Sequence, residues 1–164
     1  MSITRRYQPQ DASYVERCFI ELQSYEKRLE PNRVDGMQIA DAYRRYLLDR
    51  CAQSDGAVFV AEAEGVVVGF VALFVHVDSE SLIEAQTDYA YISDLVVLPA
   101  FRRHGIGRAL LQQAESYARD HGAAVMKVDV LIANTVAYDL YHTAGFQDHE
   151  VRLTKSLLLP APPG

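Results

Sequence analysis

Apolar residues recur along the chain with two different spacings, which divide it into predicted helices and strands. In four stretches the apolar positions lie three or four residues apart, the spacing of an amphipathic helix. These stretches are residues 11–29, 37–53, 105–121 and 134–144. Five other stretches are rich in β-branched and aromatic residues and are bounded by turn residues, which predicts strands. They are residues 3–8, 57–63, 66–77, 89–98 and 125–132.

The order of these elements predicts an α/β (α+β) fold, with one mixed sheet covered by helices. Glu64-Gly65 joins two strands as a hairpin-like turn, so the first half is expected to contribute antiparallel strands. The second half has the order β-α-β-α-β, and residues 146–159 are expected to supply two more strands. The absence of a linker predicts one domain over residues 1–159, and residues 160–164 are expected to form a flexible tail.

Composition and charge exclude several classes of protein. With 49% hydrophobic residues among 164, the chain is expected to fold. Sixteen Lys and Arg against 22 Asp and Glu give a net charge of −6, which disfavours nucleic acids and anionic membranes as partners. The longest uncharged apolar run, residues 66–77, is shorter than the roughly 18 residues of a membrane helix, and a signal peptide is not expected. Cys18 and Cys51 lack metal-ligand spacing, so we expect buried thiols, no metal site and a reducing, cytoplasmic location.

The most distinctive local pattern is Arg102-Arg103-His104-Gly105-Ile106-Gly107-Arg108, between a predicted strand and a predicted helix. Glycines let a backbone approach a ligand closely, and the first N–H groups of a helix have no internal partner. These groups and the arginines favour an anion site, and the alternative is an ordinary turn with solvated arginines. The dinucleotide fingerprint fails because Leu110 takes the place of its third glycine.

Further elements flank this turn. Leu95-Val96-Val97-Leu98-Pro99 precedes it, Asn134 follows Gly105 by 29 residues, and residues 137–146 read Ala-Tyr-Asp-Leu-Tyr-His-Thr-Ala-Gly-Phe. With Arg102, Gly105 and Gly107, they resemble the R/Q-x-x-G-x-G/A turn and the A-x-x-L-Y-x-x-x-G-F helix of the GNAT superfamily of N-acetyltransferases. The resemblance covers residues 94–146. It implies the GNAT acyltransferase fold, a mixed, mostly antiparallel sheet of six to seven strands with about four helices, whose central strands splay apart to admit CoA.

The resemblance also implies acetyl-CoA as the cofactor and indicates where it binds. The backbone of residues 103–108 would hold the pyrophosphate, and that of Leu95 and Val97 would pair with the pantetheine arm. The N–H of Leu95 or Val96 would meet the thioester oxygen. Asn134 would bond to the same arm, cap the following helix, or do both. The expected cofactor-binding residues are Leu95, Val96, Val97, Arg102, Arg103, His104, Gly105, Ile106, Gly107, Arg108, Asn134 and Tyr141.

Acetyl transfer to an amine requires a proton donor and a proton acceptor. Tyr141 occupies the family position of the general acid, which protonates the leaving thiolate; the alternative is an aromatic core residue. Asp129 and Asp94 interrupt apolar strands and are candidate bases, with relay through ordered water as a third possibility. Either carboxylate could instead be structural. The segment around Asp94 resembles that of polyamine acetyltransferases, but Ser93 replaces an acidic residue there.

Two functions remain open from the sequence. The leading one is an acetyl-CoA-dependent N-acetyltransferase that acts by direct attack, through a tetrahedral intermediate, on a small cationic amine or on a lysine or N-terminal amine. The alternative is a catalytically idle CoA-binding sensor. The acidic connection of residues 78–88 weakly favours a cationic acceptor, although a solvated acidic loop explains it equally well. A homodimer is compatible with the family.

Overall fold

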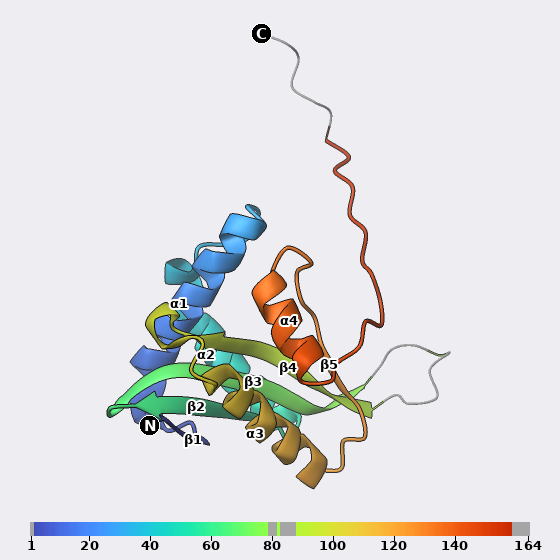
Figure 1. Cartoon of the computed structure of the whole chain (residues 1–164). Coiled ribbons are helices and arrows are strands. Elements are labelled where there is room, and N and C mark those ends of the chain that lie inside the picture. Colours follow the sequence, from blue (N-terminus) through green and yellow to red (C-terminus); the bar gives the residue numbers. More distant parts are fainter. Residues whose placement is uncertain (1, 79–81, 83–87, 159–164) are drawn as a thin grey trace.

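One five-stranded sheet runs through the part of the chain that the computed structural model describes, residues 2–78, 82 and 88–158 (Figure 1). Its strands lie in chain order: β1 (Ser2–Arg6), β2 (Ala57–Ala63), β3 (Val66–Asp78), β4 (Asp88–Val97) and β5 (Met126–Val128). Strands β1 to β4 are antiparallel to their neighbours, whereas β5 lies parallel to β4. The predicted mixed, mostly antiparallel sheet is therefore confirmed.

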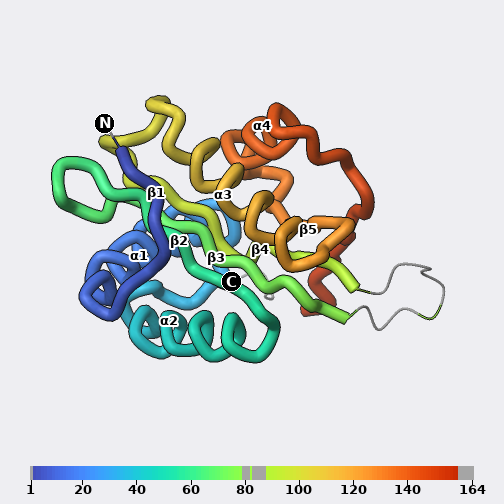
Figure 2. The backbone as a smooth tube through the Cα atoms, turned by 90° about the horizontal axis from the view of Figure 1, so that it is seen from below, coloured from blue at the N-terminus to red at the C-terminus, as the bar shows by residue number. Residues whose placement is uncertain are grey.

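Helices cover both faces of the sheet. The helices α1 (Ala12–Leu29) and α2 (Gly36–Gln53) lie on one face, and α3 (Ile106–Asp120) and α4 (Thr135–Thr143) on the other (Figure 2). Two short 3₁₀ turns, η1 (Pro9–Asp11) and η2 (Pro99–Phe101), complete the elements. The central strand β3 is buried on both sides, since Phe70 packs toward α1 and α2 and Val71 toward α3. This double burial explains the nearly continuous apolar run of residues 66–77.

The sheet opens between β4 and β5. The two strands pair only from Ala90–Met126 to Ile92–Val128, while β4 continues to Val97 beside β3. A register shift against β3 makes Ser93 an extra residue, a β-bulge that reverses the side-chain alternation. Ile92 therefore packs on the α3 side, whereas Val96 packs on the α1 and α2 side.

Three local predictions are confirmed, namely the hairpin, the start of the helix at Asn134 and the burial of both cysteines. Both strands of the hairpin form, and the turn residues Glu64 and Gly65 adopt left-handed backbone conformations, with φ of 53° and 77°. The helix predicted from Asn134 begins there, because the Asn134 Oδ1 accepts the Ala137 N–H at 3.2 Å. Both cysteines are buried and unbonded to each other. In the described ranges no helix combines the length and apolar character needed to cross a bilayer.

Two strand predictions are wrong. The strand expected over residues 125–132 is limited to Met126–Val128, because β5 diverges from β4 and loses its pairing partner. Residues 147–158 form no strand, and each of them is exposed. Their alternation predicts a strand, but a strand needs a neighbour, and no described residue of this chain pairs with them. The predicted tail, 160–164, and most of the acidic connection, 79–81 and 83–87, lie outside the described residues.

Candidate active site

The glycine turn forms an open helix N-terminus. Gly105 is the N-cap of α3 and has a φ of 79°, a left-handed conformation that favours glycine. No side chain in the described ranges caps α3, and its first turn has no acidic residue. The first backbone bond of the helix runs from the Ala109 N–H to the Gly105 carbonyl, at 3.0 Å. The N–H groups ahead of Ala109 are thus directed outward, an arrangement that suits an anion.

The arginines of this turn have different roles. The Arg102 Nε donates to the Val97 carbonyl at 2.9 Å, and its guanidinium lies 3.7 Å from Glu21 and 5.8 Å from the ring centre of Tyr25. Arg102 therefore fastens the turn to β4 and α1. Arg103 and Arg108 are exposed and form no ion pair with any described residue. Both side chains therefore add positive charge at the open end of α3.

Gly107 leaves space that the protein itself does not require. A Cβ added there would lie 3.4 Å from Leu140 Cδ2 and 3.8 Å from Val97 Cγ2, which are ordinary contacts. Packing alone would therefore tolerate a small side chain at this position. A glycine here keeps the surface of the turn open, which fits a ligand that lies against the backbone.

The splayed edge of β4 exposes particular backbone groups. The Leu98 N–H donates to the Val68 carbonyl at 2.8 Å, and Val96 lies opposite Phe70 in the same register. Alternate residues of an antiparallel strand bond to the same neighbour. The backbone of Val96 therefore bonds toward β3, whereas the N–H and C=O groups of Leu95 and Val97 face the side that β5 has left.

Asp94 lies beneath this edge and is buried. Its carboxylate accepts hydrogen bonds from the Tyr43 hydroxyl at 3.0 and 3.2 Å and from the Ser93 hydroxyl at 2.8 Å. Burial raises the pKa of Asp94 to about 6, and the two hydroxyl donors partly oppose this shift. The result is a buried carboxyl that ionises near neutral pH.

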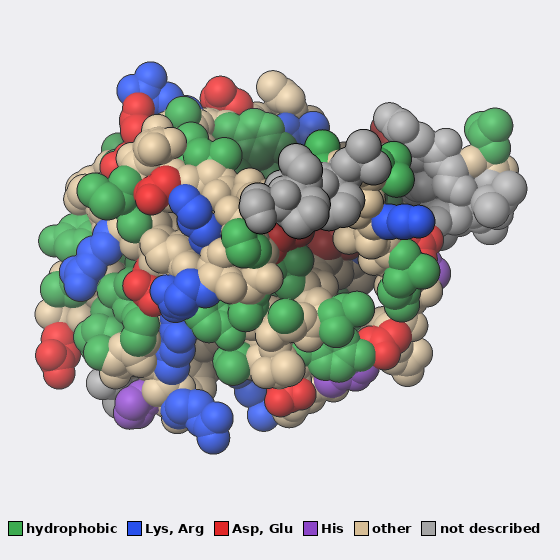
Figure 3. Space-filling view, turned by 90° about the horizontal axis from the view of Figure 1, so that it is seen from above, with side chains coloured by type: hydrophobic (Ala, Val, Ile, Leu, Met, Phe, Trp, Pro, Cys, Tyr) green, Lys and Arg blue, Asp and Glu red, His purple; other side chains and the backbone are tan. Residues whose placement is uncertain are grey.

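Tyr141 approaches the same region from α4. Its ring is buried edge-on against Phe146, at 5.5 Å between ring centres. Burial raises the pKa of Tyr141, and the negative charges of Asp94 and Glu26 raise it further, so the phenol stays protonated at neutral pH. No hydrogen bond joins its hydroxyl to another residue in the described part of the chain. Figure 1 shows α4 and α1 on either side of β4, and Figure 3, seen from above, shows Asp or Glu side chains in a recess of this face.

Asp129 lies one residue beyond β5 and is exposed, so its expected place inside a strand is wrong. Its carboxylate accepts a hydrogen bond from the Tyr91 hydroxyl at 3.2 Å. The two candidate bases chosen from the sequence therefore differ in their surroundings, because Asp94 is buried and Asp129 is exposed.

Asn134 is buried, and its Oδ1 is occupied by the helix cap, which leaves the amide NH₂ without a partner among the described residues.

The sequence analysis did not identify two residues that influence the pKa values of Asp94 and Tyr141. The helical spacing counts Tyr43 of α2 as one of its apolar positions and gives no role to Glu26 of α1. Glu26 forms an ion pair with Arg33 at 2.9 Å, and burial raises the pKa of its carboxyl. A partly buried acid on a helix face indicates a candidate functional group. This burial becomes visible only when α1 is docked against the sheet.

Tyr138 lies at the surface of α4, next to the C-terminal segment. Its hydroxyl donates to Asp148 at 2.7 Å, and its ring lies 4.4 Å from the ring of His142, which contacts the same carboxylate at 2.9 Å. These contacts fix the chain just after α4. Tyr138 therefore anchors the start of the C-terminal segment and lies on the surface of the helix.

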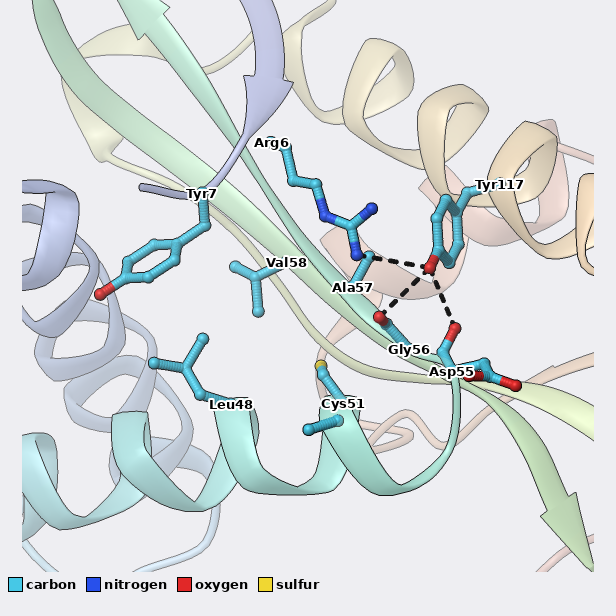
Figure 4. Close-up of a pocket in the computed structure, with 10 residues that line it drawn as sticks. Arg6, Tyr7, Leu48, Cys51, Asp55, Gly56, Ala57, Val58 and Tyr117 are labelled. Atoms are coloured by element: carbon cyan, nitrogen blue, oxygen red, sulfur yellow. Dashed lines mark hydrogen bonds between the residues drawn. The ribbon is translucent and has the colours of Figure 1, made fainter. Parts of the chain in front are cut away.

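A separate pocket of about 350 Å³ lies between β1, α2 and α3 (Figure 4). The Tyr117 hydroxyl donates to the carbonyls of Asp55 and Gly56, at 3.1 and 3.3 Å, and the Arg6 guanidinium lies 5.2 Å from its ring centre. These bonds pin α3 to the start of β2. None of the residues that line this pocket belongs to the glycine turn, β4 or α4.

Comparison with known proteins identifies the family. The model of the Acetyltransferase (GNAT) family matches residues 21–146, well over half of the chain. The chain belongs to the GNAT acetyltransferase family. This match includes the glycine turn, the splayed strands and the helix that carries Tyr141.

Individual relatives of this GNAT chain carry acetyltransferase names. An uncharacterized N-acetyltransferase, MJ1207 of Methanocaldococcus jannaschii, is 37% identical over 109 residues, which is 66% of this chain and 46% of that protein. The chain thus spans less than half of that relative's length. The aminoglycoside N(6')-acetyltransferase type 1 of Salmonella typhimurium is 25% identical over 124 residues, 76% of this chain and 81% of that protein.

Solved structures share the GNAT fold over nearly the whole chain. The aminoglycoside acetyltransferase AAC(6')-Iy, in complex with a bisubstrate analogue of CoA, has a TM-score of 0.69 and 21% identity and covers 97% of this chain and 99% of its own. A GCN5-related N-acetyltransferase from Ralstonia eutropha has a TM-score of 0.72 and 23% identity, with 96% and 99% covered. At these identities the likeness establishes the fold.

Proposed function

We propose that this GNAT chain transfers the acetyl group of acetyl-CoA to a primary amine, with Asp94 as proton acceptor and Tyr141 as proton donor. One observation carries the proposal. The unpaired edge of β4 runs between a buried carboxyl that ionises near neutral pH and a buried phenol that stays protonated. A proton acceptor and a proton donor on the two sides of one open strand are the groups that acyl transfer to an amine requires.

The residues present fit acetyl-CoA. The open N-terminus of α3, with Arg103 and Arg108 beside it, suits the pyrophosphate, and Gly107 leaves the space that this group needs. The outward N–H and C=O groups of Leu95 and the N–H of Val97 can pair with an extended amide chain as an added strand would. The Val97 carbonyl already accepts the Arg102 Nε. The free amide of Asn134 offers one further donor to that chain. When bound, acetyl-CoA supplies the acetyl group and a thiol as leaving group.

Asp94 is the stronger of the two candidate bases. An alkyl ammonium has a pKa near 10, so the acceptor must lose a proton before it can attack. A base with a pKa of about 6 is ionised at pH 7 and still close enough to neutrality to share a proton efficiently. Asp129 is exposed and occupied by the Tyr91 hydroxyl, so it is better suited to orienting Tyr91 or an ordered water.

The two remaining roles are stabilisation of the thioester oxygen and protonation of the leaving sulfur, and we assign them to groups on β4 and α4. Of the two backbone donors expected at the thioester oxygen, Leu95 has its N–H on the open side of β4, whereas Val96 bonds toward β3. We therefore assign charge stabilisation at that oxygen to Leu95. The Tyr141 hydroxyl has no competing partner in the described chain, and it is the proton donor to the departing sulfur.

A small cationic amine is the proposed acceptor class. Glu26 and Asp94 place two acidic groups near Tyr141, and both raise its pKa. Clustered carboxylates in a recess concentrate cations. Two relatives are named aminoglycoside N(6')-acetyltransferases, and this supports an amine acceptor.

The decisive experiment is a thiol-release assay with acetyl-CoA and a panel of aminoglycosides, polyamines, lysine peptides and uncharged arylamines. We expect thiol release that depends on the amine, with a product heavier by one acetyl group by mass spectrometry. Calorimetric titration with acetyl-CoA is run in parallel. Binding without acetyl transfer to any amine would support the alternative, a CoA-binding sensor, and would overturn the proposed chemistry.

A further inference from the structure

Arg33 lies on the connection between α1 and α2 and bridges two carboxylates of α1. Its Nη1 lies 2.9 Å from the Glu26 carboxylate, and its Nε donates to the Glu30 carboxylate at 2.9 Å. The two acidic side chains are one helical turn apart and differ in exposure, 20% for Glu26 and 51% for Glu30. The guanidinium therefore lies between an inner and an outer carboxylate.

The connection keeps its shape through contacts that do not involve the Arg33 side chain. The Gln23 Nε2 donates to the Val34 carbonyl at 3.0 Å. Gly36 packs so closely on α1 that a Cβ there would lie 3.0 Å from Gln23 Cβ and from Ile20 Cα. Ion pairs between partly exposed side chains add little to stability. The Arg33 side chain can therefore be displaced without loss of the connection.

Glu26 lies close enough to the proposed acid and base to act on both. Burial is the largest cause of the raised pKa values of Asp94 and Tyr141, and the negative charge of Glu26 raises both of them further. Burial also raises the pKa of the Glu26 carboxyl, and the positive charge of Arg33 opposes this shift only in part. Glu26 is thus an incompletely compensated carboxylate beside the proposed reaction site, and it stabilises a cation there.

We propose that Arg33 is an internal counter-cation of Glu26 and that the second ammonium group of a polycationic acceptor displaces it. This inference rests on the proposed function, in which Asp94 takes the proton of the reacting amine. That amine must give up its proton, so it cannot also serve as the cation at Glu26. A further ammonium group of the same molecule can do so, whereas a monoamine leaves the Arg33–Glu26 pair in place. Arg33 is therefore a specificity-determining residue, because it sets the affinity that a polycation must exceed to reach Glu26.

The exchange leaves no carboxylate of this cluster without a cation. When an ammonium group takes over Glu26, the Arg33 guanidinium keeps Glu30, its more exposed partner. This matters because a partly buried charge that loses its partner destabilises the fold. An ammonium is a compact point charge that suits one carboxylate, whereas the planar guanidinium can bridge two. The two acids of α1 therefore allow one cation to replace the other at low cost.

Equilibrium binding of amines to the CoA-saturated chain tests this role, since CoA carries no acetyl group and no turnover occurs. Spermidine is the polycationic probe and butylamine the monoamine, each titrated by calorimetry. Arg33→Gln removes the internal cation, and Arg33→Lys keeps its charge. Arg28→Gln is the matched control, because it removes the same charge from an exposed position of α1, where the guanidinium lies 5.5 Å from the ring centre of Tyr25. Glu26→Gln, alone and combined with Arg33→Gln, completes a double-mutant cycle.

We expect Arg33→Gln to bind spermidine about fivefold more tightly than the parent and to bind butylamine within about twofold of it. Arg33→Lys and Arg28→Gln should stay within about twofold of the parent for both amines. In the Glu26→Gln background, the gain from Arg33→Gln should fall to about twofold or less.

An Arg33→Gln chain without tighter spermidine binding overturns the proposal, as does spermidine that binds neither this variant nor the parent. An equal gain in Arg28→Gln, or an undiminished gain in the Glu26→Gln background, would reduce the effect to overall charge and also overturns it. Thiol release from acetyl-CoA is measured separately. Spermidine binding in the expected pattern without thiol release would support the role of Arg33 and overturn only the proposed chemistry.

Discussion

The Tyr43 hydroxyl of α2 donates a hydrogen bond to the Asp94 carboxylate of β4 at 3.0 Å. This bond joins α2 to β4, the strand whose edge is open where β5 diverges. The bulge at Ser93 makes it possible, because it turns Asp94 toward α2 while the backbone of Leu95 faces the open edge. One irregular residue thus places a carboxylate and a backbone donor on adjacent sides of the same strand.

Replacing Asp94 by Asn is expected to lower activity and raise stability together. The pKa of Asp94 is raised from 3.8 to about 6 by burial, so the folded protein binds this proton more tightly than the unfolded chain does. Stability from this group is therefore complete below pH 4 and is lost as pH rises to 6. Asp94→Asn should raise the free energy of unfolding above pH 6 by up to about 3 kcal/mol.

The same variant should lower kcat/KM by about 10²- to 10⁴-fold, as expected for loss of a general base. Thermal unfolding from pH 4 to 8 and thiol-release kinetics measure the two effects. Asp129→Asn is the control, and we expect it to change activity less. An Asp94→Asn protein with the parent's activity would contradict the assignment.

Replacing Tyr43 by Phe is expected to move the pH profile. The Tyr43 hydroxyl stabilises the ionised form of Asp94, so its loss should raise the pKa of that carboxyl further. The acid limb of kcat/KM should shift upward by roughly half to one pH unit, the equivalent of about 1 kcal/mol. Tyr46→Phe, on the exposed side of the same helix, should leave the limb in place. A structural role for Tyr43 alone would change the rate without moving the limb.

Replacing Tyr141 by Phe is expected to slow the reaction and leave acetyl-CoA affinity nearly unchanged. The ring stays to pack against Phe146, while the proton donor is lost. We expect kcat to fall by about 10²- to 10⁴-fold. Tyr138→Phe, one turn earlier on α4, is the matched control and should stay within about threefold of the parent. Equal losses in both variants would point to packing of α4 as the cause.

Replacing Gly107 by Val is expected to weaken acetyl-CoA binding in a folded protein. The nearest atoms to a Cβ at this position are 3.4 Å away, so the fold should tolerate the change, and the side chain would cover the turn. Calorimetry should give a Kd at least about tenfold larger, a loss of about 1.4 kcal/mol. Ala109→Val adds similar bulk at an exposed position of α3 and should leave Kd near the parent value. Unchanged affinity at Gly107→Val would place the pyrophosphate elsewhere.

Replacing Glu26 by Gln is expected to reduce preference for cationic acceptors. Removing one partly buried carboxylate should lower kcat/KM for aminoglycosides and polyamines by about five- to tenfold at low salt, with a smaller loss at high salt. Uncharged arylamines should be unaffected. Glu30→Gln removes the other carboxylate that pairs with Arg33 and serves as the control. Equal losses for charged and uncharged acceptors would count against an electrostatic role of Glu26.

Local features of this fold were predictable, and long-range ones were not. The hairpin at Glu64-Gly65 and the cap at Asn134 depend on neighbouring residues, so the sequence contains them directly. The Tyr43–Asp94 bond joins residues 51 positions apart, and no spacing rule connects them. Residues 146–158 show the converse case. Their alternation is a local signal for a strand, but pairing depends on a partner that the sequence pattern does not specify.

The bond from Arg102 Nε to the Val97 carbonyl has a mechanical consequence for the site as a whole. It ties the turn that precedes α3 to the end of β4, so the proposed pyrophosphate site and the proposed binding edge for the pantetheine arm are held at a fixed separation. Because this separation is fixed in the free protein, binding would require little further ordering of the backbone. A ligand that uses both proposed sites would then be selected by the length between its charged end and its reactive end as well as by its chemistry.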